Sequence, residues 1–120
     1  MILVDTSVWV DHLRSGNATL AHELEAGRVL AHPFVIGELA CGNVQNRREV
    51  LDLLGRLPSV PMATHAEALG FLDRRALMGR GIGFIDVHLL ASAALAAPTR
   101  LWTRDRRLAA VASALKLAYE

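Results

Sequence analysis

Cysteine is almost absent from the sequence, and this excludes several kinds of site. The one residue, Cys41, cannot form an internal disulfide, and no Cys-x-x-Cys pair is present to bind zinc or carry redox chemistry. Long apolar runs are also absent, because charged residues or glycines interrupt each hydrophobic segment before it reaches the roughly 20 residues of a membrane span. We therefore expect a soluble protein with no membrane partner.

The N-terminus also lacks the features of a secretory signal. The chain begins MILVDTSVWV, with no basic residue ahead of the apolar part and an acid at position 5. We therefore expect a cytoplasmic protein. Its 120 residues are enough for one hydrophobic core, and no linker, repeat or low-complexity segment divides them. The prediction is a single domain spanning residues 1–120.

Lysine is as rare as cysteine, since 12 of the 13 basic residues are arginine, and the net charge is only +1. Arginine suits phosphate groups because its planar fork donates two parallel hydrogen bonds. The arginines gather in two groups, Arg74, Arg75 and Arg80 in the first and Arg104, Arg106 and Arg107 in the second. Such groups also occur on solvated helix faces, so the charge pattern permits a nucleic-acid partner without requiring one.

Short apolar segments alternate with longer amphipathic ones along the chain. Four segments have the length and composition of buried strands, at 2–4, 29–31, 60–62 and 100–103. The predicted helices are at 8–13, 19–26, 33–41, 46–57, 64–78, 85–97 and 108–115. This alternation predicts an α/β fold with a central, mainly parallel sheet and helices on both faces. Sites in such sheets lie at the carboxyl ends of the strands.

Four acids are positioned to meet at that edge of the sheet. Asp5 directly follows the first strand, and Asp105 lies just beyond the last. Asp86 lies in the first turn of a helix that follows a glycine-rich loop, and Glu38 lies on the helix that leaves the second strand. We therefore predict that Asp5, Glu38, Asp86 and Asp105 share one cleft.

Four carboxylates in one cleft repel one another unless cations neutralise them. Ligation by oxygen alone, with no nearby cysteine and no paired histidine, favours Mg²⁺ or Mn²⁺ over zinc. Such ions activate a water molecule and stabilise the leaving oxygen when a phosphodiester is cleaved. The four acids are therefore the predicted catalytic and metal-binding residues.

Each acid also has a purely structural explanation. Asp5 and Asp86 suit the positive end of a helix dipole, Asp105 suits a helix cap, and Glu38 suits an exposed surface. The explanation is weakest for Asp5, because an acid directly after a buried strand is costly unless it is paired or used.

Four segments of the chain together resemble the PIN-domain ribonucleases, especially the VapC toxins of bacterial toxin–antitoxin pairs. They are Asp5–Asp11 (DTSVWVD), Pro33–Leu39 (PFVIGEL), Gly83–Ala91 (GFIDVHLLA) and Thr103–Asp105 (TRD). The resemblance implies a three-layer α/β/α fold, endonucleolytic cleavage of RNA with Mg²⁺ or Mn²⁺, a cognate antitoxin that covers the cleft, and a homodimer.

Residue by residue, the resemblance assigns roles to positions of this sequence. Asp5 and Asp86 match the central metal ligands, and Glu38 and Asp105 match further ligands or groups that position water. Thr6 and Thr103 match hydroxyl positions that orient the acids. We also expect Arg104, Arg106 and Arg107 to contact RNA. Relatives often carry an aromatic residue soon after the last acid, whereas this stretch of the present chain is Arg106-Arg107-Leu108.

Two other classes of protein share parts of this pattern. A phosphoacceptor signalling domain would need an acid at the end of a middle strand and a lysine near the last strand, but segment 60–62 is followed by no acid and Lys116 lies in the tail. A module of the same fold that only binds a partner would retain the architecture without catalysis. Loss of metal binding would distinguish that module from a nuclease.

Overall fold

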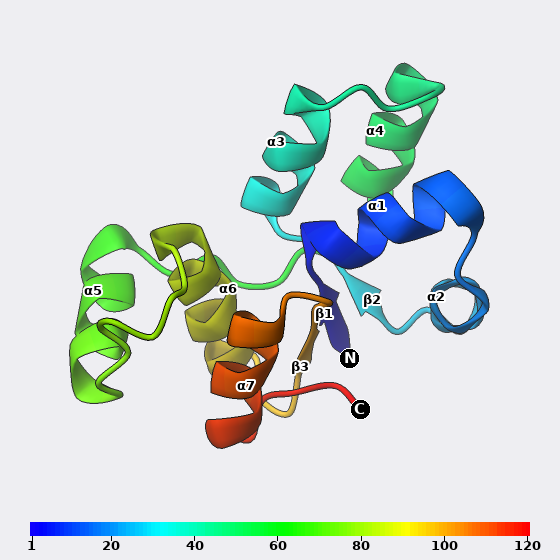
Figure 1. Cartoon of the computed structure of the whole chain (residues 1–120). Helices are drawn as coiled ribbons and strands as arrows, with labels where there is room; N and C mark the ends of the chain where they lie inside the picture. Colours follow the sequence, from blue (N-terminus) through cyan, green and yellow to red (C-terminus); the bar gives the residue numbers. More distant parts are fainter.

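The computed structural model describes all residues, 1–120, as a small parallel sheet covered by helices (Figure 1). The strands are β1 (Ile2–Val4), β2 (Val29–Leu30) and β3 (Arg100–Trp102). The helices are α1 (Thr6–Ser15), α2 (Ala18–Glu25), α3 (Pro33–Cys41), α4 (Arg47–Arg56), α5 (His65–Arg74), α6 (Phe84–Leu95) and α7 (Arg106–Ala114). None of the helices has the combined length and hydrophobicity that a membrane span requires.

The sheet has the order β2-β1-β3, and both strand pairs are parallel. Every residue of the central strand β1 is buried, because helices α1–α4 lie to one side of the strands and α5–α7 to the other (Figure 1). A parallel sheet covered in this way needs apolar side chains on both of its faces, as the sequence Ile2-Leu3-Val4 provides. The predicted three-layer α/β fold is therefore confirmed.

The prediction of a strand at 60–62 was wrong. The chain makes only an isolated parallel bridge there, between Ser59 and Ala31, and the Val60 N–H donates to the Ala31 carbonyl at 2.9 Å. Pro33 has no N–H to donate to the Val60 carbonyl, and it already begins α3, so the pairing stops after one bridge. This bridge covers the edge of β2, and the C-terminal tail covers the edge of β3 through a bridge between Leu101 and Ala118.

The seven predicted helices are all present, and the largest difference is at α5, which ends four residues before the predicted Met78. The chain turns at Ala76, whose φ of 53° is left-handed. The Leu77 N–H donates to the Leu72 carbonyl and the Ala76 N–H to the Asp73 carbonyl, which is the Schellman pattern of a helix end. This turn buries Leu77 to 2% exposure, so tertiary packing decides where α5 ends.

Candidate active site

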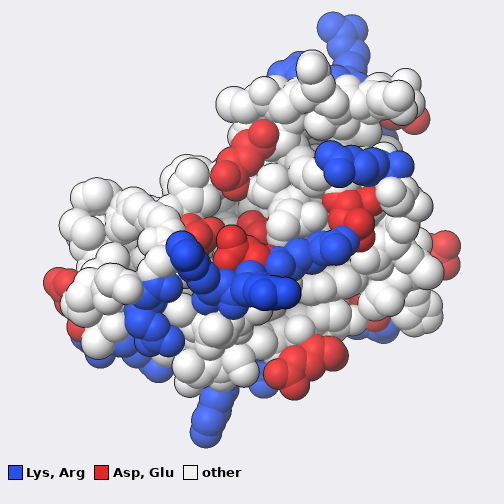
Figure 2. All heavy atoms as spheres, in the orientation of Figure 1, with Lys and Arg blue, Asp and Glu red and all other residues white.

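The structure places each of the four predicted acids at the start of a helix or on a helix beside the carboxyl edge of the sheet. Asp5 follows β1 at the N-terminal end of α1, Asp105 precedes α7 just after β3, Asp86 lies in the first turn of α6, and Glu38 lies on α3. Figure 2 shows acidic atoms in a hollow at the centre of this face, with basic atoms along its border.

Asp5 is the most tightly held of the four acids. Its side chain is buried, and Oδ2 accepts hydrogen bonds from the hydroxyls of Ser7 at 2.9 Å and Thr103 at 2.8 Å. The Asp5 N–H donates to the Trp102 carbonyl at 2.9 Å, which joins the end of β1 to the end of β3. Two strands and two hydroxyls therefore determine where this carboxylate lies.

Ser7 is a site residue that the sequence reasoning missed. Its hydroxyl donates to Asp5 and accepts the Arg104 N–H at 2.9 Å, so it links α1 to the loop after β3. The spacing could have revealed it, because a serine two residues after an acid at a helix start readily makes a local side-chain contact.

A hydroxyl also holds Glu38. The Thr6 hydroxyl donates to Glu38 Oε1 at 2.8 Å, across 32 residues of sequence. Thr6 and Thr103 therefore each bind one acid, Glu38 and Asp5 respectively. A hollow of about 510 Å³ opens beside Thr6 and Glu38 between α1 and α3, lined in part by Val10, Arg14 and Leu39.

Asp86 and Asp105 bind the first turns of their own helices. Asp86 Oδ2 accepts the Gly83 N–H at 3.0 Å, and Asp105 Oδ1 accepts the Leu108 N–H at 3.0 Å. Both acids therefore do stabilise the start of a helix, as the structural explanation expects. It does not exclude a second role, because each contact uses only one carboxylate oxygen.

All four carboxylates share this asymmetry. In each, one oxygen accepts a hydrogen bond from the protein and the other has no partner in the protein. The free oxygens are Asp5 Oδ1, Glu38 Oε2, Asp86 Oδ1 and Asp105 Oδ2. None of the four acids forms an ion pair, since the two ion pairs of the chain are Arg28–Glu23 and Arg104–Asp11.

The electrostatics of Asp86 show that the acids influence one another. Burial raises the pKa of Asp86, the hydrogen bond from Gly83 lowers it, and the negative charges of Asp5, Asp105 and Glu38 raise it further. All three other acids therefore lie within electrostatic range of Asp86. Such an arrangement is stabilised by a cation.

The donor set fits a hard divalent cation, because it consists of carboxylate oxygens with no sulfur or imidazole ligand. No three acidic, histidine or cysteine side chains are gathered closely enough to surround one ion. Mg²⁺ does not require such a cage, since it keeps several waters and is usually held by one or two carboxylates together with substrate phosphates.

Arginines from both predicted groups are exposed at the surface. Arg104 lies beside Asp105 in the loop after β3, and Arg106 and Arg107 begin α7. Arg107 lies against the glycine loop, where a Cβ on Gly81 would stand only 2.7 Å from the Arg107 Cδ. Gly81 also has a φ of 79°, so a side chain there is disfavoured by both conformation and space.

Comparison with known proteins agrees with this geometry. The family description "PIN domain" matches residues 2–114, and the chain therefore belongs to the PIN-domain family. Within it, the chain is similar to Ribonuclease VapC32 of Mycobacterium tuberculosis, in the strains CDC 1551 / Oshkosh and ATCC 25618 / H37Rv. The identity is 52% over 110 residues in both cases, covering 92% of this chain and 89% of the relative.

Proposed function

We propose that this chain is a metal-dependent endoribonuclease that acts as the toxin of a type II toxin–antitoxin pair and hydrolyses RNA phosphodiesters. The observation that carries the proposal is the set of four carboxylates, each with one oxygen bound to the protein and one left free. Membership of the PIN-domain family and similarity to a protein named as a ribonuclease support it.

In this proposal Asp5 and Asp86 bind Mg²⁺ or Mn²⁺, and Glu38 and Asp105 are further ligands or hold the waters around the ion. The bound ion would activate a water molecule and stabilise the leaving oxygen of the phosphodiester. Ser7 and Thr103 keep Oδ2 of Asp5 occupied, so that Oδ1 remains the available donor. Thr6 does the same for Glu38 by holding Oε1.

RNA is proposed to approach along the exposed arginines Arg104, Arg106 and Arg107, which flank Asp105 in the sequence and bind phosphate rather than bases. Contacts with phosphate bring RNA to the acids without selecting a sequence. The order Arg104-Asp105-Arg106 places a basic residue on each side of a proposed metal-binding acid.

The remaining parts of the proposal concern assembly and location. They are a cognate antitoxin that covers the cleft, a homodimer, and a cytoplasmic location. Large apolar side chains are exposed on α5, on α6 and on the loop between them, which is surface that a second copy could cover. They include Leu69, Met78, Phe84, Ile85 and Leu95, at 37–56% exposure. Light scattering of the purified chain tests the homodimer.

The phosphoacceptor alternative no longer fits, because the chain is a PIN domain and residues 60–62 do not form the middle strand that such a protein needs. The partner-binding module without catalysis is the second candidate. It is favoured by one observation, that no three ligands are already gathered around a single point.

Cleavage of RNA by the purified chain, free of antitoxin, separates the two candidates. We expect total cellular RNA to be cut with Mg²⁺ or Mn²⁺ and to stay intact with EDTA. Asp5→Asn and Asp86→Asn should each abolish cutting, because each removes a charged metal ligand. Asp73→Asn is the matched control, since Asp73 is an exposed acid on α5 that forms no ion pair.

The partner-binding module replaces the nuclease if the wild-type chain cuts no RNA and calorimetry with Mn²⁺ detects no binding. Metal binding without cutting would keep the metal site and reject only the ribonuclease assignment.

A further inference from the structure

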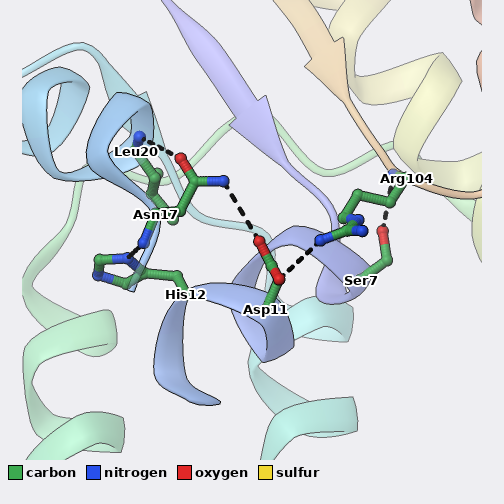
Figure 3. A network of polar contacts seen from close by, with 6 residues as sticks. All are labelled: Ser7, Asp11, His12, Asn17, Leu20 and Arg104. Atoms are coloured by element: carbon green, nitrogen blue, oxygen red, sulfur yellow. Dashed lines mark hydrogen bonds and ion pairs between the residues drawn. The ribbon is translucent and has the colours of Figure 1, made fainter. Parts of the chain in front are cut away.

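Arg104 is attached to helix α1 at two points one helical turn apart. Its backbone N–H donates to the Ser7 hydroxyl at 2.9 Å, and its Nη1 lies 2.6 Å from Asp11 Oδ1 (Figure 3). Ser7 and Asp11 are four residues apart on a helix and therefore share one face of α1. One residue of α1 thus holds the main chain of Arg104, and the other holds its side chain.

Asp11 is itself held in place from its other side. The Asn17 side-chain amide donates to Asp11 Oδ2 at 3.3 Å, while Asn17 Oδ1 accepts the Leu20 N–H and so caps α2 (Figure 3). The Asn17 N–H donates to His12 Nδ1 at 3.0 Å. The hydrogen bond from Asn17 and the charge of Arg104 hold the pKa of Asp11 below its ordinary value.

Asp11 therefore differs from the four site acids, because both of its oxygens have partners and one partner is a cation. The pair contributes little to stability, because ion pairs exposed to solvent are screened and the Arg104 side chain is 58% exposed. A guanidinium carries five N–H groups, and Asp11 binds only one of its nitrogens.

Arg104, which carries these free N–H groups, is linked to Asp5 through the hydroxyl of Ser7. Ser7 binds the Arg104 main chain and also Asp5 Oδ2 at 2.9 Å. The position of Arg104 is therefore coupled to the position of Asp5.

We propose that Asp11 is a positioning residue that orients the guanidinium of Arg104, so that its free N–H groups bind an RNA phosphate beside the acid cleft. This inference rests on the proposed ribonuclease function and extends it to a residue outside the cleft.

The proposal predicts an effect with the opposite sign to simple electrostatics. Removing a negative charge near bound RNA should strengthen binding if charge alone matters, because repulsion of the phosphates is relieved. Removing the residue that orients Arg104 should instead weaken binding, because a free arginine loses side-chain entropy when it binds. The direction of the change therefore separates the two explanations.

The experiment measures binding of a fluorescent single-stranded oligoribonucleotide of mixed sequence, by anisotropy in EDTA over a range of NaCl concentrations. We expect Arg104→Ala to lower the affinity by roughly tenfold and to reduce the salt slope by about 0.7, the value for one phosphate contact on a single strand. Asp11→Ala should lower the affinity by about threefold, and the double variant should match Arg104→Ala alone. Asp52→Ala, which removes an exposed acid of α4 with no ion pair, should bind RNA at least as tightly as wild type.

Cleavage kinetics with Mn²⁺ provide a second measurement. Asp11→Ala should raise KM and leave kcat within about twofold, since the residue acts on RNA binding rather than on the reacting atoms. Arg104→Lys should retain part of the affinity lost in Arg104→Ala, because it keeps the charge without the fork. If Asp11→Ala alters the circular dichroism spectrum, Asp11→Asn repeats the test with the side-chain shape conserved.

Tighter or unchanged RNA binding by Asp11→Ala would overturn the inference, and so would additive losses in the double variant. Either result leaves the ribonuclease function standing if the wild type still cuts RNA. A wild type that neither binds nor cuts RNA refutes the proposed function, and the inference falls with it.

Discussion

Two buried carboxylates at opposite ends of the sheet show how a structural acid differs from an acid of the candidate site. Glu23 is 8% exposed and lies near the start of the strands, where the Arg28 carbonyl accepts the Ile2 N–H. Asp5 is 7% exposed and lies where β1 ends. Their burial is nearly equal, but their partners are different.

Arg28 neutralises Glu23 with two hydrogen bonds, of 2.6 and 2.8 Å, one to each carboxylate oxygen. Asp5 receives only neutral hydroxyls, and both act on the same oxygen. The charge of Glu23 is therefore balanced within the fold, whereas no basic side chain of the chain pairs with Asp5. This difference supports the proposal of a cation at the carboxyl edge of the sheet.

The largest effect should come from removing the charge of each acid and measuring RNA cleavage with Mn²⁺. Asp5→Asn should lower the rate by roughly a hundredfold or more, because a ligand of the activating ion is lost. Glu23→Gln should cut RNA at the wild-type rate at temperatures where it is folded. Equal losses in the two variants would mean that Asp5 acts through the fold and not through the ion.

Removing the charge of Glu23 and removing that of Asp86 should change the stability of the protein in EDTA in opposite directions. The hydrogen bonds from Arg28 lower the pKa of Glu23, so its contribution to stability is present above the unfolded pKa of 4.5 and is lost as the pH falls. Burial raises the pKa of Asp86, so the folded state is favoured when Asp86 is protonated and loses that advantage as the pH rises. At pH 7 Glu23→Gln should lower the melting temperature, and Asp86→Asn should raise it.

Melting temperatures measured with Mn²⁺ test whether Asp86 binds the ion. The wild-type melting temperature should rise with Mn²⁺ because the ion binds only the folded state, and Asp86→Asn should lose most of that rise. Glu23→Gln is the control and should gain as much as wild type. A similar gain in all three proteins would place the ion elsewhere.

A smaller effect on RNA cleavage is expected when a hydroxyl that donates to Asp5 is removed. Thr103→Val keeps the shape of the side chain and removes one of the two hydrogen bonds that Asp5 Oδ2 accepts, leaving the one from Ser7. Cleavage should fall about tenfold, the lower end of the range for groups that orient metal ligands. Thr103→Ser restores the hydroxyl and should restore most of the activity. Equal activity in both variants would show that Ser7 suffices.

A buried histidine extends the comparison to a group that stays neutral. His32 is fully buried, its Nδ1 accepts the Phe34 N–H, and burial lowers its pKa to about 4. The neutral form is favoured in the folded state, so stability is present above the unfolded pKa of 6.5 and falls below it. Between pH 7 and 5.5 we expect His32 to reduce the free energy of unfolding by about 1 kcal/mol.

Urea denaturation at the two pH values measures this change. His32→Asn keeps an acceptor for the Phe34 N–H and should remove most of the pH dependence, with His88 contributing the remainder because burial lowers its pKa too. His22→Gln replaces an exposed histidine and should leave the dependence intact. An unchanged slope in His32→Asn would contradict the assignment.

Local signals in the sequence predicted most of the elements correctly. The apolar residues Ile2–Val4 predicted the central strand, and Pro33 predicted the start of α3, because apolar runs and prolines act within a few residues of their own position. The two errors were the strand at 60–62, where pairing stops because Pro33 lacks an N–H and begins α3, and the long α5, which the turn at Ala76 ends. Local periodicity does not describe contacts between distant parts of the chain. Both the short pairing of Ser59 with Ala31 and the burial of Leu77 depend on such contacts.

The sequence by itself predicted the parallel α/β architecture and the four candidate acids, because Asp5, Asp86 and Asp105 directly follow a strand or stand at a helix start, and Glu38 lies on a helix that Pro33 begins. Only the tertiary structure decided which oxygen of each carboxylate is free, that Ser7 binds Asp5, and that Asp11 holds Arg104. These contacts join residues as far apart as 98 positions in sequence, as between Thr103 and Asp5. They depend on the relative placement of strands and helices, which packing of the whole core determines.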